Sequence, residues 1–120
     1  MVLDITEPAG QETLKALVQQ YDVVIGSEQL ASAGIGYAEI RSWNPNAIFT
    51  SVTGFGDDGP YAEFESSHLI NCAMGGWAQV CGVPEREPIQ AGGSTPEMLT
   101  GGYAASASLL AVLGRSHHGA

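Results

Sequence analysis

Hydrophobic and polar positions in the first half of the chain follow helix and strand periods in turn. In and after Gln11–Gln20, apolar residues take the i, i+3, i+4, i+7 spacing of one helix face. The continuous β-branched run Val23–Ile25 indicates a strand covered on both faces. The expected elements are strand Val2–Ile5, helix Gln11–Gln20, strand Val23–Ile25 ending at Gly26, helix Tyr37–Trp43 and strand Ile48–Thr53. This β-α-β-α-β order predicts an α/β fold, with a Rossmann-like parallel sheet and helices on its faces.

The second half of the chain predicts helices and no clear strand. In Ser67–Val80 one helix face collects the apolar residues Leu69, Ile70, Ala73, Met74 and Trp77. Thr95-Pro96-Glu97 is a helix start, with Thr95 as the N-cap. That helix is expected to run to about Gly114, leaving Arg115–Ala120 as a polar loop. We therefore expect a parallel segment at 1–60 and a helical segment at 61–120 of the same domain, incomplete at both ends.

The charge balance excludes two classes of partner. The chain has 13 acidic residues against four Lys and Arg, a net charge of −9. Nucleic acids and anionic membranes are bound by clustered cations, and these four are scattered. No apolar run reaches the roughly 20 residues of a membrane span, and the N-terminus lacks a signal-peptide pattern. The sequence thus predicts a cytoplasmic protein with no nucleic-acid or membrane partner.

The two cysteines suggest no special chemistry. Cys72 and Cys81 fit neither a C-x-x-C motif nor a zinc spacing, so no metal site is expected. They are most simply reduced thiols in the core.

A glycine-rich loop follows the last expected strand. Gly54-Phe55-Gly56 stands where an open α/β sheet presents backbone N–H groups to ligands. It lacks G-x-G-x-x-G and the P-loop lysine, and Asp57-Asp58 would repel a phosphate. Taken alone, it is either a ligand loop or an ordinary strand-exit turn.

Two residues of the second half are candidates for chemistry. Glu97 either complements the helix dipole or, being kept ionised there, serves as a nucleophile toward an acyl thioester. His68, at the start of an apolar helix, is either a surface or capping residue or a functional one.

The segment SVTGFGDDGPYA, Ser51–Ala62, resembles the most diagnostic segment of the class III CoA-transferases, the CaiB/BaiF family. That family includes formyl-CoA and carnitine CoA-transferases and 2-methylacyl-CoA racemases. The flanking segments resemble it in order and spacing over nearly all 120 residues. The resemblance implies part of the family's large domain, an internal piece of a longer protein, and an interlocked homodimer when full-length. It implies acyl-CoA and a small carboxylic acid as substrates, with no tightly bound cofactor.

The resemblance also assigns roles to residues. The family's catalytic aspartate stands in D-x-x-T-G, and Glu97 takes its place in Glu97-Met98-Leu99-Thr100-Gly101. In the family this carboxylate forms a mixed anhydride with the acyl group and then a thioester with CoA. CoA contacts are implied for Gly54, Phe55 and Gly56. They are also implied for Ser27, which begins a shorter, arginine-free stretch where the family has N-F-R-P-G.

Two other functions stay open. One is a non-catalytic CoA-transferase-like half with a folding or subunit-interaction role. The other is an acyl-CoA racemase using His68 with Glu97. Alignment on Ala73 and Gly76 puts the racemase histidine at Ser67, and one residue along a helix turns a side chain by about 100°. Whatever the parent enzyme does, we expect the isolated 120 residues neither to turn over nor to bind CoA tightly.

Overall fold

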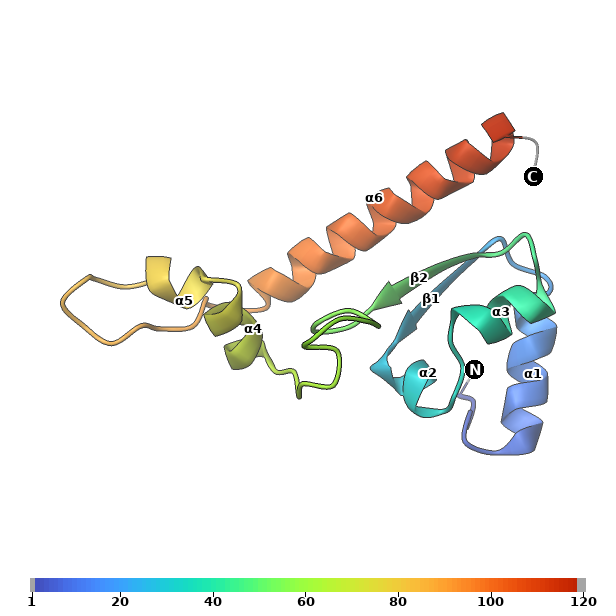
Figure 1. Cartoon of the computed structure of the whole chain (residues 1–120), viewed down its shortest axis with the longest axis horizontal. Coiled ribbons are helices and arrows are strands. Elements are labelled where there is room, and N and C mark those ends of the chain that lie inside the picture. The colour runs from blue at the N-terminus through green and yellow to red at the C-terminus, as the bar shows by residue number, and fades with distance from the viewer. Residues whose placement is uncertain (1, 119–120) are drawn as a thin grey trace. The chain divides into compact units, whose positions relative to one another are not determined.

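The computed structural model describes residues 2–118 and divides them into two units (Figure 1). Unit 1 contains the residues up to Val52 and those from Ala104 onwards, and unit 2 is Thr53–Tyr103. The elements are α1 Pro8–Val18, β1 Val23–Ser27, α2 Glu28–Ser32, α3 Tyr37–Trp43, β2 Ile48–Val52, α4 His68–Met74, α5 Trp77–Val80 and α6 Thr95–His118. None of the described helices is long and apolar enough to cross a membrane.

Unit 1 is built on two parallel strands. β1 pairs with β2 in a register that runs from Val23 opposite Ile48 to Ser27 opposite Val52. The connection between them passes through α2 and α3, as a parallel pair requires. The α/β class and the parallel pairing are thus confirmed.

The end expected for the first of these strands is wrong. Gly26 was expected to end it, but Gly26 is buried and continues the pairing. A Cβ at Gly26 would lie 2.8 Å from the Phe49 ring, so glycine lets the two strands and this ring pack.

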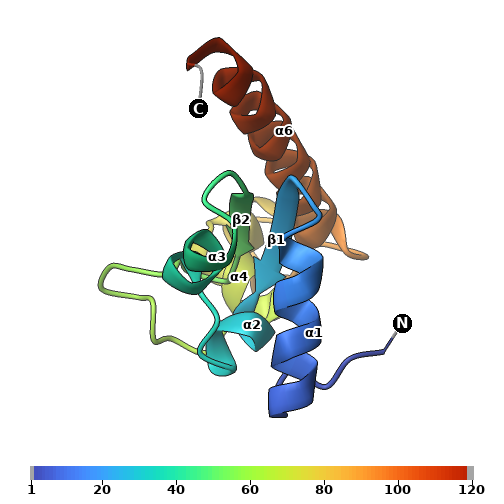
Figure 2. The same cartoon turned by 90° about the vertical axis from the view of Figure 1, so that its right-hand side faces the viewer.

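Helices lie on both sides of the strands in unit 1. α1, α2 and α3 lie on one side, and the part of α6 that belongs to this unit lies on the other (Figures 1 and 2). Val18, Ile35 and Ile40 form the buried core. Partly buried apolar residues pack around these three: Leu14, Val24, Leu30, Ala33, Trp43, Ala47 and Phe49.

The expected strand at Val2–Ile5 does not form. The Asp4 carboxylate accepts hydrogen bonds from the Thr6 backbone N–H at 3.0 Å and from its hydroxyl at 2.6 Å. This local turn satisfies polar groups that a strand would have paired with a neighbour. α1 instead begins at Pro8, three residues before the expected start, because proline suits the first turn of a helix.

Polar contacts attach the C-terminal part of α6 to the rest of unit 1. The buried Ser108 hydroxyl donates to the Ala104 carbonyl at 2.8 Å and lies 2.6 Å from the Thr50 hydroxyl. Arg115 donates to the Asn46 carbonyl at 2.7 Å and pairs with Asp22 at 2.5 Å.

The loop expected from Arg115 onwards is therefore helix as far as His118. The contacts of Arg115 with Asn46 and Asp22 stabilise the helix beyond Gly114. The last two residues of the expected loop, 119 and 120, lie outside the described part of the chain.

Unit 2 contains two short helices where one was expected. α4 ends at Met74, and Gly76 takes the left-handed conformation, with φ 78°, before α5. Two consecutive glycines make that break cheap. Cys72 and Ala78 are buried in this part of unit 2. Four of the five residues of the expected apolar face are exposed: Leu69, Ile70, Ala73 and Met74.

Candidate active site

α4 begins with a histidine. Ser67 is extended, with φ −151°, and its hydroxyl accepts the Ile70 backbone N–H at 3.3 Å. This cap makes His68 the first helical residue. Ser67, where the alignment puts the racemase histidine, is therefore the N-cap of α4.

His68 contacts three groups, each from a different place in the sequence. Its Nδ1 lies 2.7 Å from Glu97 Oε1, and its Nε2 lies 3.1 Å from the Ala91 carbonyl oxygen. Cys72 Sγ, one turn along α4, lies 3.6 Å from the same Nε2. The His68 side chain is 24% exposed and that of Glu97 52% exposed. The two residues that the sequence named as candidates for chemistry are therefore brought into direct contact.

The contact favours opposite charges on the two side chains. The hydrogen bond to Glu97, followed by that to Ala91, raises the pKa of His68 above its usual 6.5. The hydrogen bond from His68, followed by one from its own backbone N–H, lowers the pKa of Glu97 below its usual 4.5. Near pH 6 the arrangement is a carboxylate beside an imidazolium.

Glu97 lies in the first turn of α6. The helix begins at Thr95, with Pro96 and Glu97 following. Thr95 is not the N-cap that was expected but the first helical residue, since the Met98 N–H donates to the Ser94 carbonyl at 2.9 Å. The Thr95 hydroxyl donates to the Gly92 carbonyl at 3.0 Å. The carboxylate lies at the positive end of a long helix, which further favours its ionised form.

The glycine-rich loop is tightly folded. A Cβ at Gly54 would lie 2.2 Å from the Ser66 Cβ, and Gly56 has φ 91°, so both positions require glycine. The Gly56 backbone N–H donates to the Thr53 hydroxyl at 2.8 Å. This geometry makes the loop a defined turn, and its role toward a ligand stays a prediction.

Aromatic rings accompany the loop. The Phe55 ring centroid lies 6.4 Å from that of Tyr61 and 6.1 Å from that of Phe64, and the last two are 5.1 Å apart. These separations are those of edge-to-face aromatic pairs. Phe55 thus has a packing role in unit 2 that the sequence pattern did not indicate.

Ser27, the other proposed CoA contact, belongs to unit 1. It is the last residue of β1 and precedes α2 without capping it through its side chain. The helix α2 was not expected, because its five residues are too few to show a periodic pattern.

Asn71 is a half-buried polar residue that the sequence pattern did not single out. Its Oδ1 is buried with no hydrogen-bond partner in the described part of the chain, and it lies 3.6 Å from where a Cβ on Gly54 would be. An unpaired buried acceptor is costly unless a ligand or water satisfies it. No periodic or motif signal in the sequence points to this atom.

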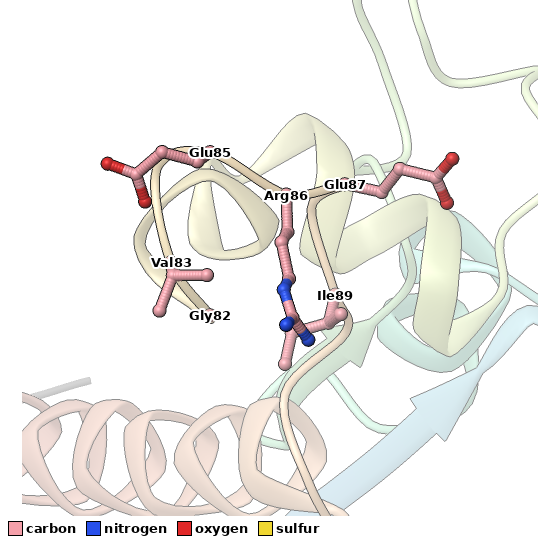
Figure 3. A pocket seen from close by; sticks show the side chains of 6 residues that line it. All are labelled: Gly82, Val83, Glu85, Arg86, Glu87 and Ile89. Atoms are coloured by element: carbon pink, nitrogen blue, oxygen red, sulfur yellow. The ribbon is translucent and has the colours of Figure 1, made fainter.

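A pocket of about 660 Å³ lies in the connection before α6. In Figure 3 the Arg86 guanidinium points between Val83 and Ile89, while Glu85 and Glu87 point away from it. In the sequence, Arg86 is only one of the four scattered cations, with no role predicted for it. An arginine between apolar walls offers a site for an anionic group, since guanidinium binds carboxylates and phosphates.

Comparisons with known proteins agree on one family. The family model described as CoA-transferase family III matches residues 1–120. A succinate–glutarate CoA-transferase from Agrobacterium fabrum is 36% identical over 116 residues, 94% of this chain and 29% of that protein. A succinyl-CoA–D-citramalate CoA-transferase from Chloroflexus aurantiacus is 34% identical over 122 residues, 99% of this chain and 30% of that protein.

The fold agrees as well. The crystal structure of a CAIB/BAIF family protein from Brucella suis has a TM-score of 0.87 and 34% identity, covering 98% of this chain and 32% of that one. The chain therefore spans less than a third of these relatives.

Proposed function

Because the chain belongs to CoA-transferase family III, we propose that it is part of an enzyme that transfers CoA between an acyl-CoA and a carboxylic acid. Glu97 is the nucleophile. The observation that carries this proposal is the Glu97 carboxylate in the first turn of α6, 2.7 Å from the His68 imidazole. A carboxylate held ionised by a cation and a helix N-terminus is available for attack near neutral pH. Its sequence context, Glu97-Met98-Leu99-Thr100-Gly101, resembles the family's D-x-x-T-G.

The covalent bonds that form and break belong only to the Glu97 carboxylate and the two substrates. A Glu97 oxygen attacks the thioester carbonyl carbon, the C–S bond breaks, and its electron pair leaves with sulfur as CoA thiolate. The thiolate then attacks the Glu97 side-chain carbonyl carbon and releases the first acid as a carboxylate. The acceptor carboxylate repeats the two steps in reverse and leaves as the new acyl-CoA. Each step exchanges one anion for another, so no net proton is consumed.

Short dicarboxylic acids are the proposed acyl and acceptor groups. The two relatives are named for succinate, glutarate and citramalate. CoA binds as a substrate, with contacts from Gly54, Phe55, Gly56 and Ser27, and the full-length protein is an interlocked homodimer in the cytoplasm. The cytoplasmic assignment is supported by Cys72 and Cys81, which are both free thiols.

The test is acyl-enzyme trapping in the full-length protein that carries this chain. With succinyl-CoA and hydroxylamine, the wild-type protein should form a hydroxamate at Glu97, located by peptide mass spectrometry. Glu97→Gln should abolish it and lower kcat by at least about 10³-fold, because an amide is not a nucleophile. Glu97→Asp should retain activity, since it restores the family residue.

Glu87→Gln is the matched control. It makes the same chemical change at an exposed side chain in the connection before α6, and it should leave trapping unchanged. No hydroxamate in the wild-type protein, with no turnover for any acid pair, would instead favour the non-catalytic half. A fully active Glu97→Gln protein would remove Glu97 from the mechanism.

A second candidate, an acyl-CoA racemase, is favoured by the same contact. The one-residue offset from Ser67 was expected to turn the histidine away from the acid, yet His68 Nδ1 lies 2.7 Å from Glu97. Two such groups can remove and return an α-proton. A racemase would exchange the α-proton of a 2-methylacyl-CoA in deuterated water without any acceptor acid, whereas the transferase would not.

A further inference from the structure

The His68 ring faces an oxygen acceptor at each nitrogen. Nδ1 lies 2.7 Å from a carboxylate oxygen of Glu97, and Nε2 lies 3.1 Å from the carbonyl oxygen of Ala91. Neither an ionised carboxylate nor a carbonyl can donate a hydrogen bond. A neutral imidazole carries one N–H, so both contacts are made together only when both nitrogens are protonated. The geometry therefore calls for an imidazolium against Glu97.

The ring is also held in place from the side away from Glu97. Ala91, whose carbonyl receives the Nε2–H, is only 5% exposed. Cys72, 1% exposed, lies one turn along α4 with its sulfur 3.6 Å from Nε2. The titratable groups that face the ring are thus the Glu97 carboxylate from α6 and the Cys72 thiol from α4 itself. With Nε2 committed to a backbone carbonyl, Nδ1 keeps a fixed direction toward Oε1.

We propose that His68 is a second catalytic residue of the transfer reaction: its Nδ1–H is the oxyanion donor for Glu97 Oε1, which leaves Oε2 as the attacking atom. This inference rests on the proposed function. An oxyanion donor must already point at the oxygen on which negative charge develops. His68 meets that requirement before any substrate binds.

The hydrogen bond from His68 to Oε1 can be kept through each step of the reaction. In the first step Oε2 forms a bond to the thioester carbonyl carbon and CoA thiolate departs. Oε1 then becomes the carbonyl oxygen of the anhydride, and it can still accept the hydrogen bond from His68. When CoA thiolate adds to the Glu97 carbonyl carbon, the C=O electron pair moves onto Oε1, and the imidazolium stabilises that charge. The pair returns to re-form the carbonyl as the bond to Oε2 breaks, and the acid leaves with Oε2. His68 keeps its proton throughout.

Two amide replacements separate this role from simple packing. In the full-length protein, His68→Asn places an amide N–H near the position of Nδ1, whereas His68→Gln places one near Nε2. With succinyl-CoA and glutarate as the probe pair, His68→Ala should lower kcat by about 10²- to 10³-fold, the effect of losing one oxyanion donor. KM should change less than threefold. His68→Asn should recover at least tenfold over His68→Ala, and His68→Gln should not.

The pH profile and a neighbouring variant complete the test. The wild-type kcat should fall at alkaline pH as the imidazolium is lost, and this limb should be missing from His68→Asn, which does not titrate there. Ser67→Ala weakens the start of α4 without removing the imidazole and should keep kcat within threefold.

Three results would overturn the inference: His68→Ala with kcat within threefold of wild type, equal impairment of the Asn and Gln variants, or an unchanged alkaline limb in His68→Asn. If Glu97→Gln is inactive while His68→Ala turns over normally, only the role of His68 fails. If Glu97→Gln is active, the proposed function fails first.

Discussion

The two units of this chain are stabilised in different ways. Unit 1 combines a parallel strand pair with a core of Val18, Ile35 and Ile40. Unit 2 exposes much of its apolar surface, including Leu69 and Met74. Its long-range order at the candidate site comes from polar contacts such as that between His68 and Glu97. Unit 1 thus has a cluster of buried apolar side chains against its strand pair, whereas directional hydrogen bonds position the candidate reactive groups of unit 2.

The largest expected effect on stability comes from the core of unit 1. Ile40 is 1% exposed, and Ile40→Ala should lower the free energy of unfolding by about 2–5 kcal/mol, because it leaves a cavity as well as removing buried methylenes. Urea unfolding of the two proteins measures this difference. Ile25→Ala is the control: Ile25 is 58% exposed, so the same truncation should cost much less. Equal losses would contradict the assignment of the core to Ile40.

A smaller effect is expected from adding a methyl group to the strand pair. Gly26→Ala should cost about 1–3 kcal/mol, since overpacking strains the surrounding side chains. The new Cβ would lie 2.8 Å from Phe49, an aromatic ring with little room to move. Gly114→Ala in α6, where a Cβ meets nothing within 4 Å, should instead stabilise by about 0.5–1 kcal/mol. The two substitutions should therefore shift Tm in opposite directions, which differential scanning calorimetry measures. Shifts in the same direction would refute this account of Gly26.

The smallest effect is the pH dependence of the His68–Glu97 contact. The raised pKa of His68 means that its stabilisation is fully present below pH 6.5 and is lost as the pH rises through that raised value. The lowered pKa of Glu97 means that its stabilisation is present above pH 4.5 and is lost as the pH falls through that lowered value. The pair should thus contribute most between about pH 4.5 and 6.5. Urea midpoints across this range should differ between wild type and His68→Ala, and identical curves would exclude the ion pair.

In both units, the expected elements that formed and those that did not are separated by a physical reason. The helix expected at Tyr37–Trp43 matches α3 residue for residue, and the Asn44-Pro45 pair that directly follows it is a local stop signal. The strand expected at Val2–Ile5 is wrong because a strand needs a paired neighbour, and Asp4 forms a local turn with Thr6 instead. The single helix expected at Ser67–Val80 is wrong because its periodic apolar residues hide a break. The consecutive glycines Gly75 and Gly76 end α4 before α5 begins.

The candidate site was only half accessible to sequence reasoning. Glu97 and His68 could be named from residue type and resemblance, but they are 29 residues apart and nothing local shows that they touch. The ring partner, Ala91, acts through its backbone carbonyl, so its side chain carries no signal. Arg86 and the buried Asn71 oxygen likewise became visible only in three dimensions.

Unit 1 is discontinuous in sequence, with the whole of unit 2 inserted between Val52 and Ala104. The contacts that complete it link residues far apart in the chain, 58 positions for Thr50 with Ser108 and 93 for Asp22 with Arg115. A ribosome delivers the chain from its N-terminus. The strands of unit 1 therefore emerge first, yet the helix that completes the unit emerges only after all of unit 2. During synthesis, the face of β1 and β2 opposite α1–α3 therefore stays uncovered until some fifty further codons have been translated and α6 has been made.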